Sequence, residues 1–459
     1  MTNSPTNSGV DLHLELSGTR LAAGLSDALR DAVRSGRLAP GTRLPASRTL
    51  AADLGVSRST VTESYAELIA EGWLTARQGS GTRVARRASP APRAAVPPRS
   101  RPLDGLLPGA AGFAEFPRAA WLAAARRALN TAPHTAFGYG DPIGRIELRT
   151  ALAGYLARVR GVHADPGRII ICSGFHHGLA LTARALVARG VRSVAVEEYG
   201  LDLYRALLTD AGLHIPALPV DDQGARVDGL DRPGAVLLTP AHQFPTGFAL
   251  SAGRRAAVVD WARATGGLIL EDDYDGEFRY DRKPVGALQG LDPERVLYFG
   301  TASKSLAPAV RVAWIVAPHH LVPGLAAAKG RVETVGVLDQ LTLAGLITSG
   351  AFDRHVRGRR LSYRRRRDQL VTAIAREKPH IRVTGMAAGL QAVLELPPGA
   401  ESRTVAAAAR HGLLVRGLSE FRHEALDRRT GRDALVVNYA AVSDSAWDSA
   451  LTALVAVLP

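Results

Sequence analysis

The sequence has a single cysteine, Cys172, and four lysines, and it lacks any apolar run of the roughly 18 residues that a membrane-spanning helix needs. One cysteine excludes a disulfide scaffold and cysteine-based metal clusters. The N-terminal segment is polar and lacks the basic and apolar parts of a secretory signal. These absences predict a cytoplasmic protein with no membrane-embedded part.

The composition is that of a globular protein, with 46% hydrophobic and 22% charged residues, and 459 residues suffice for roughly three domains. Basic residues outnumber acidic ones by 57 to 43, a net charge of +14, and 53 of these bases are arginine. We ascribe the arginine excess to coding bias rather than to function. The scarcity of lysine, in contrast, makes any lysine beside a chemical motif conspicuous.

The N-terminal part, 13–84, has the pattern of a helix-turn-helix. Apolar residues recur at helical spacing over 19–35, and a short helix is predicted over 47–54. Gly55 makes the turn, and Ser57 caps a second helix. Two short extended runs around 79–81 then predict a hairpin wing.

Several polar and basic residues of this part are placed to contact DNA, because the first turn of a recognition helix meets base edges and phosphates. From Met1 to Arg101 there are 14 arginines and 8 acidic residues, a net charge of +6. The alternative is a small helical domain with solvated arginines. The predicted DNA-binding residues are Arg48, Ser57, Arg58, Ser59, Thr60, Arg77, Gly79 and Gly81.

The motifs LPASRTLAADLGVSRSTVTESYAELIAEGWL and GSGTRV resemble the GntR-type winged helix-turn-helix over about 70 residues. The following segment, 85–102, holds five prolines and five arginines, and we interpret it as a semi-rigid linker.

Residues 103–459 alternate between strand-like and helix-like segments. The apolar runs RIIICSG, SVAVEE, AVLLTP, GLILEDD, VLYFGT and VAWIVAP lack period-two alternation, as in strands buried on both faces. Helical patterns lie between them, so we expect an α/β fold with a mostly parallel, doubly wound sheet. Ligands bind such sheets beyond the carboxyl ends of the strands.

The strand ends of this domain carry chemically suggestive groups. Ser173 and Gly174 precede a predicted helix whose N-terminal amides could cradle a phosphate. Asp272 and Tyr274 follow another strand, and Lys304 follows a third between hydroxyl residues and Arg311. A desolvated lysine forms Schiff bases, and an acid suits a protonated pyridine nitrogen. Together these groups meet the needs of pyridoxal phosphate.

Two other kinds of site fit the residues less well. The acidic run from Glu271 to Glu277 could suggest a divalent metal, but no glycine-spaced loop or nearby histidine supports it, and we predict no metal. A hydrolase using Cys172 with His176 or His177 lacks a third, orienting residue.

The landmarks FGYGDPIGRIELR, TPAHQFPTG, EDDYDGEFRY and TASKSLAPAVR resemble fold type I aminotransferases. Together with the N-terminal helix-turn-helix, these landmarks make the whole chain resemble the MocR branch of GntR regulators. This resemblance implies a Schiff base on Lys304, with Asp272 at the pyridine nitrogen and Tyr274 at the ring hydroxyl. It implies further contacts from Ser303, Thr301, Arg311, Gly174, Phe175 and Gln243, with His242 in the same pocket. It also implies a head-to-tail homodimer in which Tyr139 reaches a phosphate across the interface.

The chain departs from the aminotransferase pattern at three positions. Phe244 stands where an asparagine is usual, Val436 where an arginine clamps the substrate carboxylate, and Leu201 where an aromatic stacks on the ring. Arg416 or Arg422 could bind the carboxylate in place of that arginine, or neither of them does. The cofactor chemistry is therefore expected to be intact and the recognition of amino acids altered.

We favour a transcriptional regulator that binds a double-stranded DNA operator and senses an amine, an amino acid or pyridoxal phosphate. A residual aminotransferase half-reaction is compatible with this role. The alternative is an active pyridoxal-phosphate-dependent aminotransferase with an appended DNA-binding domain.

Overall fold

The computed structural model describes residues 21–77, 81–86, 105–109, 112–230, 234–280, 285–331, 333–426 and 431–459. The chain divides into two compact units, Met1–Arg99 and Ser100–Pro459, where its length alone suggested roughly three. The start of the predicted first domain, 13–20, and the predicted linker beyond residue 86 lie outside the described residues. No helix of the described part is long and apolar enough to span a bilayer.

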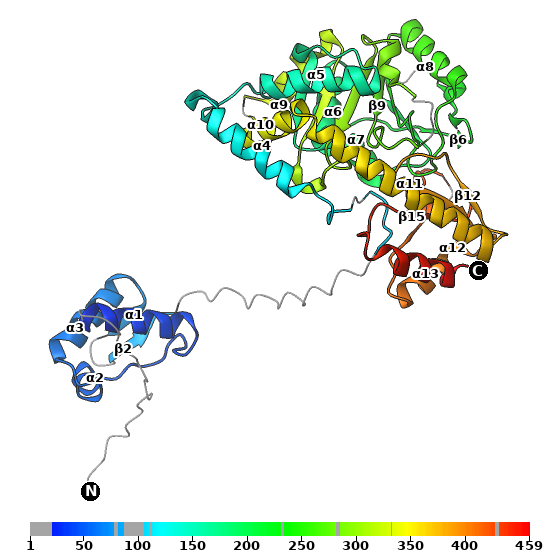
Figure 1. Ribbon diagram of the computed structural model, residues 1–459. Coiled ribbons are helices and arrows are strands. Elements are labelled where there is room, and N and C mark those ends of the chain that lie inside the picture. Colours follow the sequence, from blue (N-terminus) through cyan, green and yellow to red (C-terminus); the bar gives the residue numbers. More distant parts are fainter. Residues whose placement is uncertain are drawn as a thin grey trace. The chain divides into compact units, whose positions relative to one another are not determined.

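The first unit has three helices and a two-stranded hairpin (Figure 1). The elements are α1 (Leu21–Arg34), α2 (Ser47–Leu54), α3 (Arg58–Ala70), β1 (Leu74–Arg77) and β2 (Gly81–Val84). Gly55 ends α2 with a φ of 66°, a conformation that favours glycine. The Ser57 side chain accepts a hydrogen bond from Thr60 N at 3.1 Å and so caps α3. Leu25, Leu50 and Val61 lie in the buried core between the helices. The predicted winged helix-turn-helix is confirmed.

A seven-stranded sheet forms the larger part of the second unit. Its order is β3 (Ile169–Cys172), β11 (Ala313–Val316), β10 (Val296–Thr301), β9 (Leu268–Asp272), β8 (Ala235–Leu238), β4 (Val194–Glu197) and β5 (Ala217–Leu218). β11 is antiparallel to both neighbours, and the other pairs are parallel. A small hairpin, β6 (Val220–Asp221) and β7 (Gly224–Ala225), follows β5. The predicted mostly parallel sheet is confirmed.

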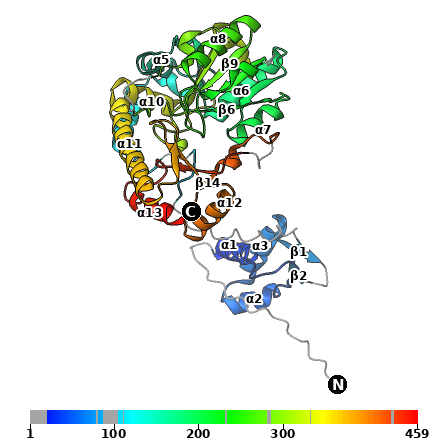
Figure 2. The same ribbon diagram turned by 90° about the vertical axis from the view of Figure 1, so that its right-hand side faces the viewer.

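Helices cover both faces of this sheet. The helices are α4 (Arg118–Thr131), α5 (Ile146–Arg160), α6 (Phe175–Ala188), α7 (Asp202–Asp210), α8 (Ala252–Thr265), α9 (Val322–Lys329) and α10 (Val337–Thr348). In β3, Ile169 and Ile171 pack in a cluster with α5 and α10, whereas Ile170 and Cys172 pack with α6. Figure 2 shows β9 between α8 and α6. Burial on both faces explains the apolar runs without alternation.

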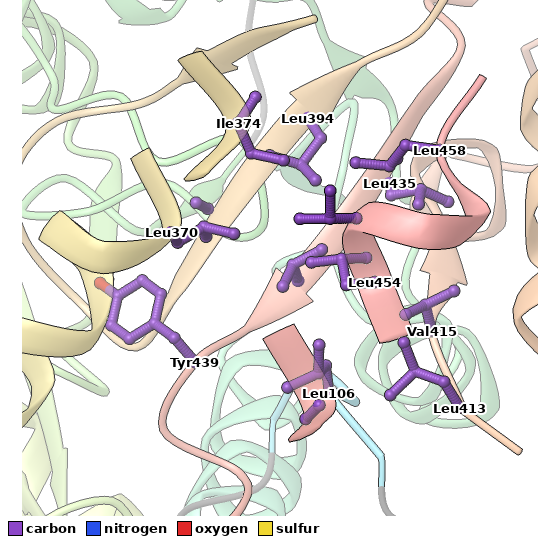
Figure 3. Packing of buried hydrophobic residues seen from close by; sticks show 14 of the residues in the cluster. Leu106, Leu370, Ile374, Leu394, Leu413, Val415, Leu435, Tyr439, Leu454 and Leu458 are labelled. Atoms are coloured by element: carbon purple, nitrogen blue, oxygen red, sulfur yellow. The ribbon is translucent and has the colours of Figure 1, made fainter. Parts of the chain in front are cut away.

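A second, antiparallel sheet completes this unit. Its order is β12 (Arg382–Thr384), β13 (Gln391–Glu395), β15 (Ala434–Asn438) and β14 (Arg416–Gly417). Three helices pack beside it: α11 (Ala351–Glu377), α12 (Glu401–Arg410) and α13 (Trp447–Val457). Leu370 and Ile374 of α11 meet Leu394, Leu435 and Leu454 in its core (Figure 3). The start of α11 packs in the core beside the large sheet, so this one helix joins both sheets.

Candidate functional site

A cavity opens at the carboxyl ends of the large sheet. Glu197 and Asp272 are the last residues of β4 and β9, and Lys304 follows β10. The lining residues are Gly109, Val196, Glu197, Tyr199, Gly200, Leu201, Tyr204, Arg205, Leu237, Thr239, Phe244, Asp272, Tyr274, Lys304, Leu390 and Gln391. The structure thus brings Lys304, Asp272 and Tyr274 together, as the strand-end rule predicts.

The half-buried Lys304 side chain lines this cavity. Burial lowers the pKa of Lys304, although the charges of Asp272 and Asp275 oppose the shift. Its Nζ donates a hydrogen bond to the carbonyl of Gly109. Burial likewise raises the pKa of the Asp272 carboxyl well above its usual value, against the charge of Lys304. A lysine that loses its proton readily is a competent nucleophile toward a carbonyl carbon.

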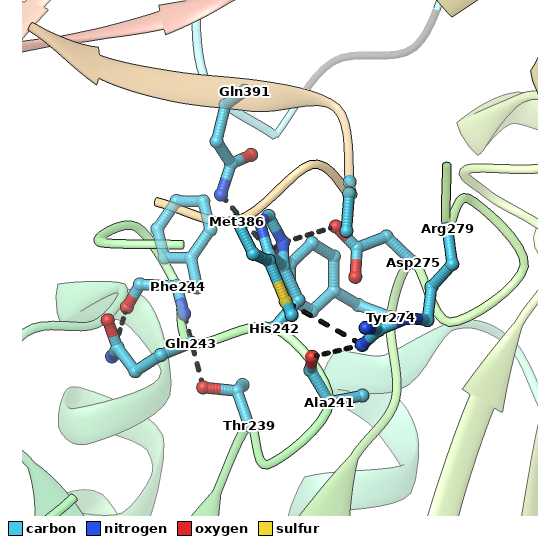
Figure 4. A network of polar contacts seen from close by, with 12 residues as sticks. Thr239, Ala241, His242, Gln243, Phe244, Tyr274, Asp275, Arg279, Met386 and Gln391 are labelled. Atoms are coloured by element: carbon cyan, nitrogen blue, oxygen red, sulfur yellow. Dashed lines mark hydrogen bonds and ion pairs between the residues drawn. The ribbon is translucent and has the colours of Figure 1, made fainter. Parts of the chain in front are cut away.

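A buried polar network holds the Tyr274 hydroxyl at the cavity wall (Figure 4). His242 Nδ1 lies 2.9 Å from Tyr274 Oη and 2.8 Å from Asp275 Oδ2. Gln391 Nε2, from β13 of the small sheet, donates to Tyr274 Oη at 3.0 Å. A β-carbon on Gly389 would lie 2.1 Å from His242 Cε1, so only glycine fits there. His242 therefore positions Tyr274 and is not part of the cavity lining.

The Gln243 side chain faces its own loop. Its Nε2 donates to the carbonyls of Tyr199 at 2.9 Å and Phe244 at 2.6 Å, and its Oε1 accepts from Thr246 N at 3.1 Å. Gln243 thereby orders the loop that carries Phe244 into the cavity wall.

Among the other predicted phosphate ligands, Arg311 lies against Gly174 at the start of α6. A β-carbon on Gly174, whose φ is 104°, would lie 2.9 Å from Arg311 Nη2, so glycine lets the guanidinium reach this helix end. Arg311 also donates to the carbonyl of Ser173. Thr301 Oγ1 donates to Ser303 Oγ at 3.0 Å, next to Lys304. The first-turn amides of a helix, here including Phe175, have no intrahelical partner and attract anions.

Tyr139 lies outside the cavity lining and is fully exposed. Its loop is nonetheless firmly held. Arg149 Nη2 donates to Asp141 Oδ2 at 2.8 Å, Arg145 N donates to Gln340 Oε1 at 2.8 Å, and Lys329 Nζ donates to the carbonyl of Pro142. These contacts hold residues 141–145, the part of the loop that follows the exposed Tyr139.

Arg416 and Arg422, the two suggested carboxylate ligands, are each paired with an acid. Arg416 Nε lies 2.8 Å from Glu420 Oε2, and Arg422 Nε lies 2.8 Å from Glu198 Oε1. Val436 is fully buried in β15 opposite Arg416. Arg205, which the sequence interpretation missed, lines the cavity instead.

The two less favoured kinds of site find no support here. Over the described residues, no group of three or more His, Cys, Asp or Glu side chains could hold a metal ion. Burial raises the pKa of the Cys172 thiol to about 12, which keeps it protonated. A protonated thiol is a poor nucleophile.

The predicted DNA-binding residues of α2 and α3 lie on the surface of the first unit. Arg48, Ser57, Arg58 and Ser59 are exposed, and Thr60 is half-buried. Arg43, which the sequence interpretation missed, reaches the wing: its Nε would lie 3.2 Å from a β-carbon on Gly81. Gly79 and the side chain of Arg77 lie outside the described residues.

Comparison with known proteins agrees with this architecture. Residues 21–84 match the family of bacterial regulatory proteins, gntR family, and residues 106–454 match aminotransferase class I and II. The pyridoxine biosynthesis transcriptional regulator PdxR of Corynebacterium glutamicum is 33% identical, over 88% of this chain and 89% of its own length. The probable rhizopine catabolism regulatory protein MocR of Rhizobium meliloti is 34% identical, over 77% of this chain and 76% of its own.

Solved structures share the fold of the second unit. Kynurenine aminotransferase of Pyrococcus horikoshii has a TM-score of 0.69 at 22% identity, over 78% of this chain and 91% of its own. The matches thus cover both units, and the curated relatives span most of the chain. The chain belongs to the GntR-family helix-turn-helix transcriptional regulators of the MocR kind, in which the DNA-binding domain is joined to an aminotransferase-like domain.

Proposed function

We propose that this regulator binds pyridoxal phosphate in the cavity of its second unit and binds a DNA operator through its first unit. Its affinity for the operator changes when a small amine, an amino acid or the cofactor itself occupies the cavity. The observation that carries the proposal is the meeting of Lys304 and Asp272 in one cavity, in a chain that also holds a winged helix-turn-helix.

The residues present fit this cofactor. The opening that Gly174 leaves for the Arg311 guanidinium, beside the start of α6, suits a phosphate. Ser303, Thr301 and the amide of Phe175 would complete that cradle. Lys304 would supply the amine, Asp272 would face the pyridine nitrogen, and Tyr274 would contact the ring hydroxyl. Gln243 would act by ordering the adjoining loop.

When bound, pyridoxal phosphate supplies an electrophilic carbon and an electron sink. The chain's own residues prepare the site for it. Burial lowers the pKa of Lys304 and so favours loss of its proton. His242 and Gln391 orient the Tyr274 hydroxyl from both sides. Phe244 and Leu390 contribute apolar side chains to the cavity wall.

The DNA-binding role is assigned to the first turn of α3 and to the wing. Arg58 and Ser59 are exposed at the helix start, where base edges are read in related geometries. Arg48, Thr60 and Gly81 would contact the sugar-phosphate backbone or the adjacent bases, with Arg43 as a further cation beside the wing.

A homodimer is the assembly that we propose for the second unit. Five large apolar side chains between residues 113 and 146 are exposed: Phe113, Leu122, Leu129, Phe137 and Ile146. Burial of exposed apolar side chains favours association. A head-to-tail partner would give the firmly held loop of Tyr139 a role at the other subunit's cofactor phosphate. Sedimentation velocity measures the assembly directly, and a monomer at micromolar concentration would contradict the dimer.

The experiment that tests the regulator is fluorescence anisotropy with DNA from upstream of its own gene. Preferential binding over scrambled DNA at physiological salt is expected, together with a change in affinity on adding ligand. Equal binding to both DNAs would contradict the proposal.

Aminotransferase activity is the second candidate, and the readily deprotonated Lys304 amine favours it. Rapid multiple turnover of common amino donors would support it, whereas at most a slow half-reaction is expected of a regulator.

A further inference from the structure

Among the described residues that line the cavity, two carry a positively charged side chain: Lys304 and Arg205. Lys304 is committed to the cofactor under the proposed function. The Arg205 side chain is only 4% exposed, and its Nε lies 2.8 Å from Glu424 Oε2. Its Nη1 donates to the carbonyl of Gly200 at 3.0 Å and its Nη2 to that of Arg422 at 3.3 Å. The charge of Arg205 is therefore already compensated, and both ends of its guanidinium donate to backbone carbonyls.

The rest of the described lining is acidic, neutral polar or apolar. Glu197 and Asp272 contribute carboxyl groups, while Leu201, Phe244 and Leu390 contribute apolar surface. Three arginines of neighbouring segments do not alter this balance. Arg416 and Arg422 each have a carboxylate partner at 2.8 Å, and Arg432, which lies beside Tyr199, has Glu395 at 3.5 Å. A ligand carboxylate would thus enter a desolvated space with no uncompensated cation to pair with.

We infer that the effector is a primary amine whose remaining part is apolar and uncharged, an alkylamine or arylalkylamine, and that α-amino acids are excluded by their carboxylate. This inference rests on the proposed function and specifies the ligand of the same cavity. The amino group is drawn toward the Glu197 carboxyl, because Asp272 would face the pyridine nitrogen, and the apolar part packs against Leu201, Phe244 and Leu390.

A matched ligand pair tests the inference. The full-length protein loaded with pyridoxal phosphate is titrated calorimetrically with 2-phenylethylamine and with L-phenylalanine, which differ by the carboxylate alone. We expect about a hundredfold weaker binding of phenylalanine, since leaving a buried charged group unpaired is costly. Equal or tighter binding of phenylalanine would overturn the inference, and so would a failure of 2-phenylethylamine to bind.

A pair of variants tests the role of Arg205. Glu424 is 56% exposed, so Glu424→Gln removes the compensating charge of Arg205 without opening the core. Phenylalanine should then bind about tenfold more tightly, with 2-phenylethylamine unchanged. Glu420→Gln is the control, because it removes the carboxylate partner of Arg416, which is not among the lining residues. It should leave the affinities for phenylalanine and for 2-phenylethylamine unchanged. No gain in Glu424→Gln, or an equal gain in both variants, would contradict the inference.

The visible absorbance of the loaded protein and its operator binding without ligand are recorded first. Loss of either contradicts the proposed function itself. If both are intact and the two ligands are not discriminated, only the inference about the ligand fails.

Discussion

Replacing Gly174 with alanine tests the phosphate cradle at the start of α6. Gly174 has a φ of 104° and a ψ of 163°, a backbone region that is essentially restricted to glycine. A β-carbon there would lie 2.9 Å from Arg311 Nη2 and 3.0 Å from its Cζ. Gly174→Ala should therefore cost about 1–3 kcal/mol of unfolding free energy through backbone strain and push the guanidinium away.

The loss in cofactor binding follows from the displaced guanidinium. A hydrogen bond to a charged group contributes about 1.5–3 kcal/mol, so pyridoxal phosphate should bind roughly 10- to 100-fold more weakly. Titration followed by visible absorbance measures the affinity, and urea unfolding measures the stability.

Gly190→Ala is the matched control for Gly174→Ala. Gly190 follows α6 with a φ of 83°, and a β-carbon there would meet nothing within 4 Å. It should cost about 1–2 kcal/mol in stability and leave cofactor affinity unchanged. Unaltered cofactor affinity in Gly174→Ala, or an equal loss in both variants, would refute the assignment of the cradle.

Three further predictions address the other parts of the chain. Lys304→Ala should abolish the visible absorbance of bound pyridoxal phosphate, and an unchanged spectrum would show that another lysine carries the cofactor. Arg58→Ala should weaken operator binding by about tenfold in anisotropy with that absorbance unaltered, while a joint loss of both properties would indicate misfolding. Burial raises the pKa of Glu197 to about 7 from 4.5, so the folded state of the cofactor-free protein binds a proton more tightly than the unfolded state does. The folded state therefore loses stability as the pH rises from about 4.5 to about 7. Glu197→Gln should therefore gain about 3 kcal/mol relative to the unaltered chain between pH 5 and pH 8, measured by urea unfolding, and a pH-independent difference would contradict this burial effect.

Local patterns predicted most elements of both units. The helix over 47–54 begins and ends as expected, because Gly55 supplies the left-handed residue that ends it. The buried strands were recognisable because both of their faces pack against helices. The predicted helix after Ser173 and Gly174 is α6, which begins at Phe175 because Gly174 forms its N-terminal boundary.

The cavity wall could be predicted only where a motif follows a strand. Lys304 and Asp272 were found in this way, since the parallel strands before them end at the same sheet edge. Gln391 lies on the small sheet. Gly109, whose carbonyl accepts a hydrogen bond from the Lys304 amine, lies almost 200 residues before it in the sequence. Their approach depends on the packing of the two sheets, which no local pattern encodes. The orientation of Gln243 likewise depends on the carbonyls of its folded loop.

The measurement that tests the central claim most directly combines both units in one titration. Operator affinity is followed by anisotropy at fixed salt while pyridoxal phosphate, and then 2-phenylethylamine, is added to the intact protein and to Lys304→Ala. Ligand should shift the operator dissociation constant of the intact protein and leave that of Lys304→Ala unchanged, since a ligand shifts an equilibrium only through differential affinity. An operator affinity that is the same with and without ligand in the intact protein would contradict the account.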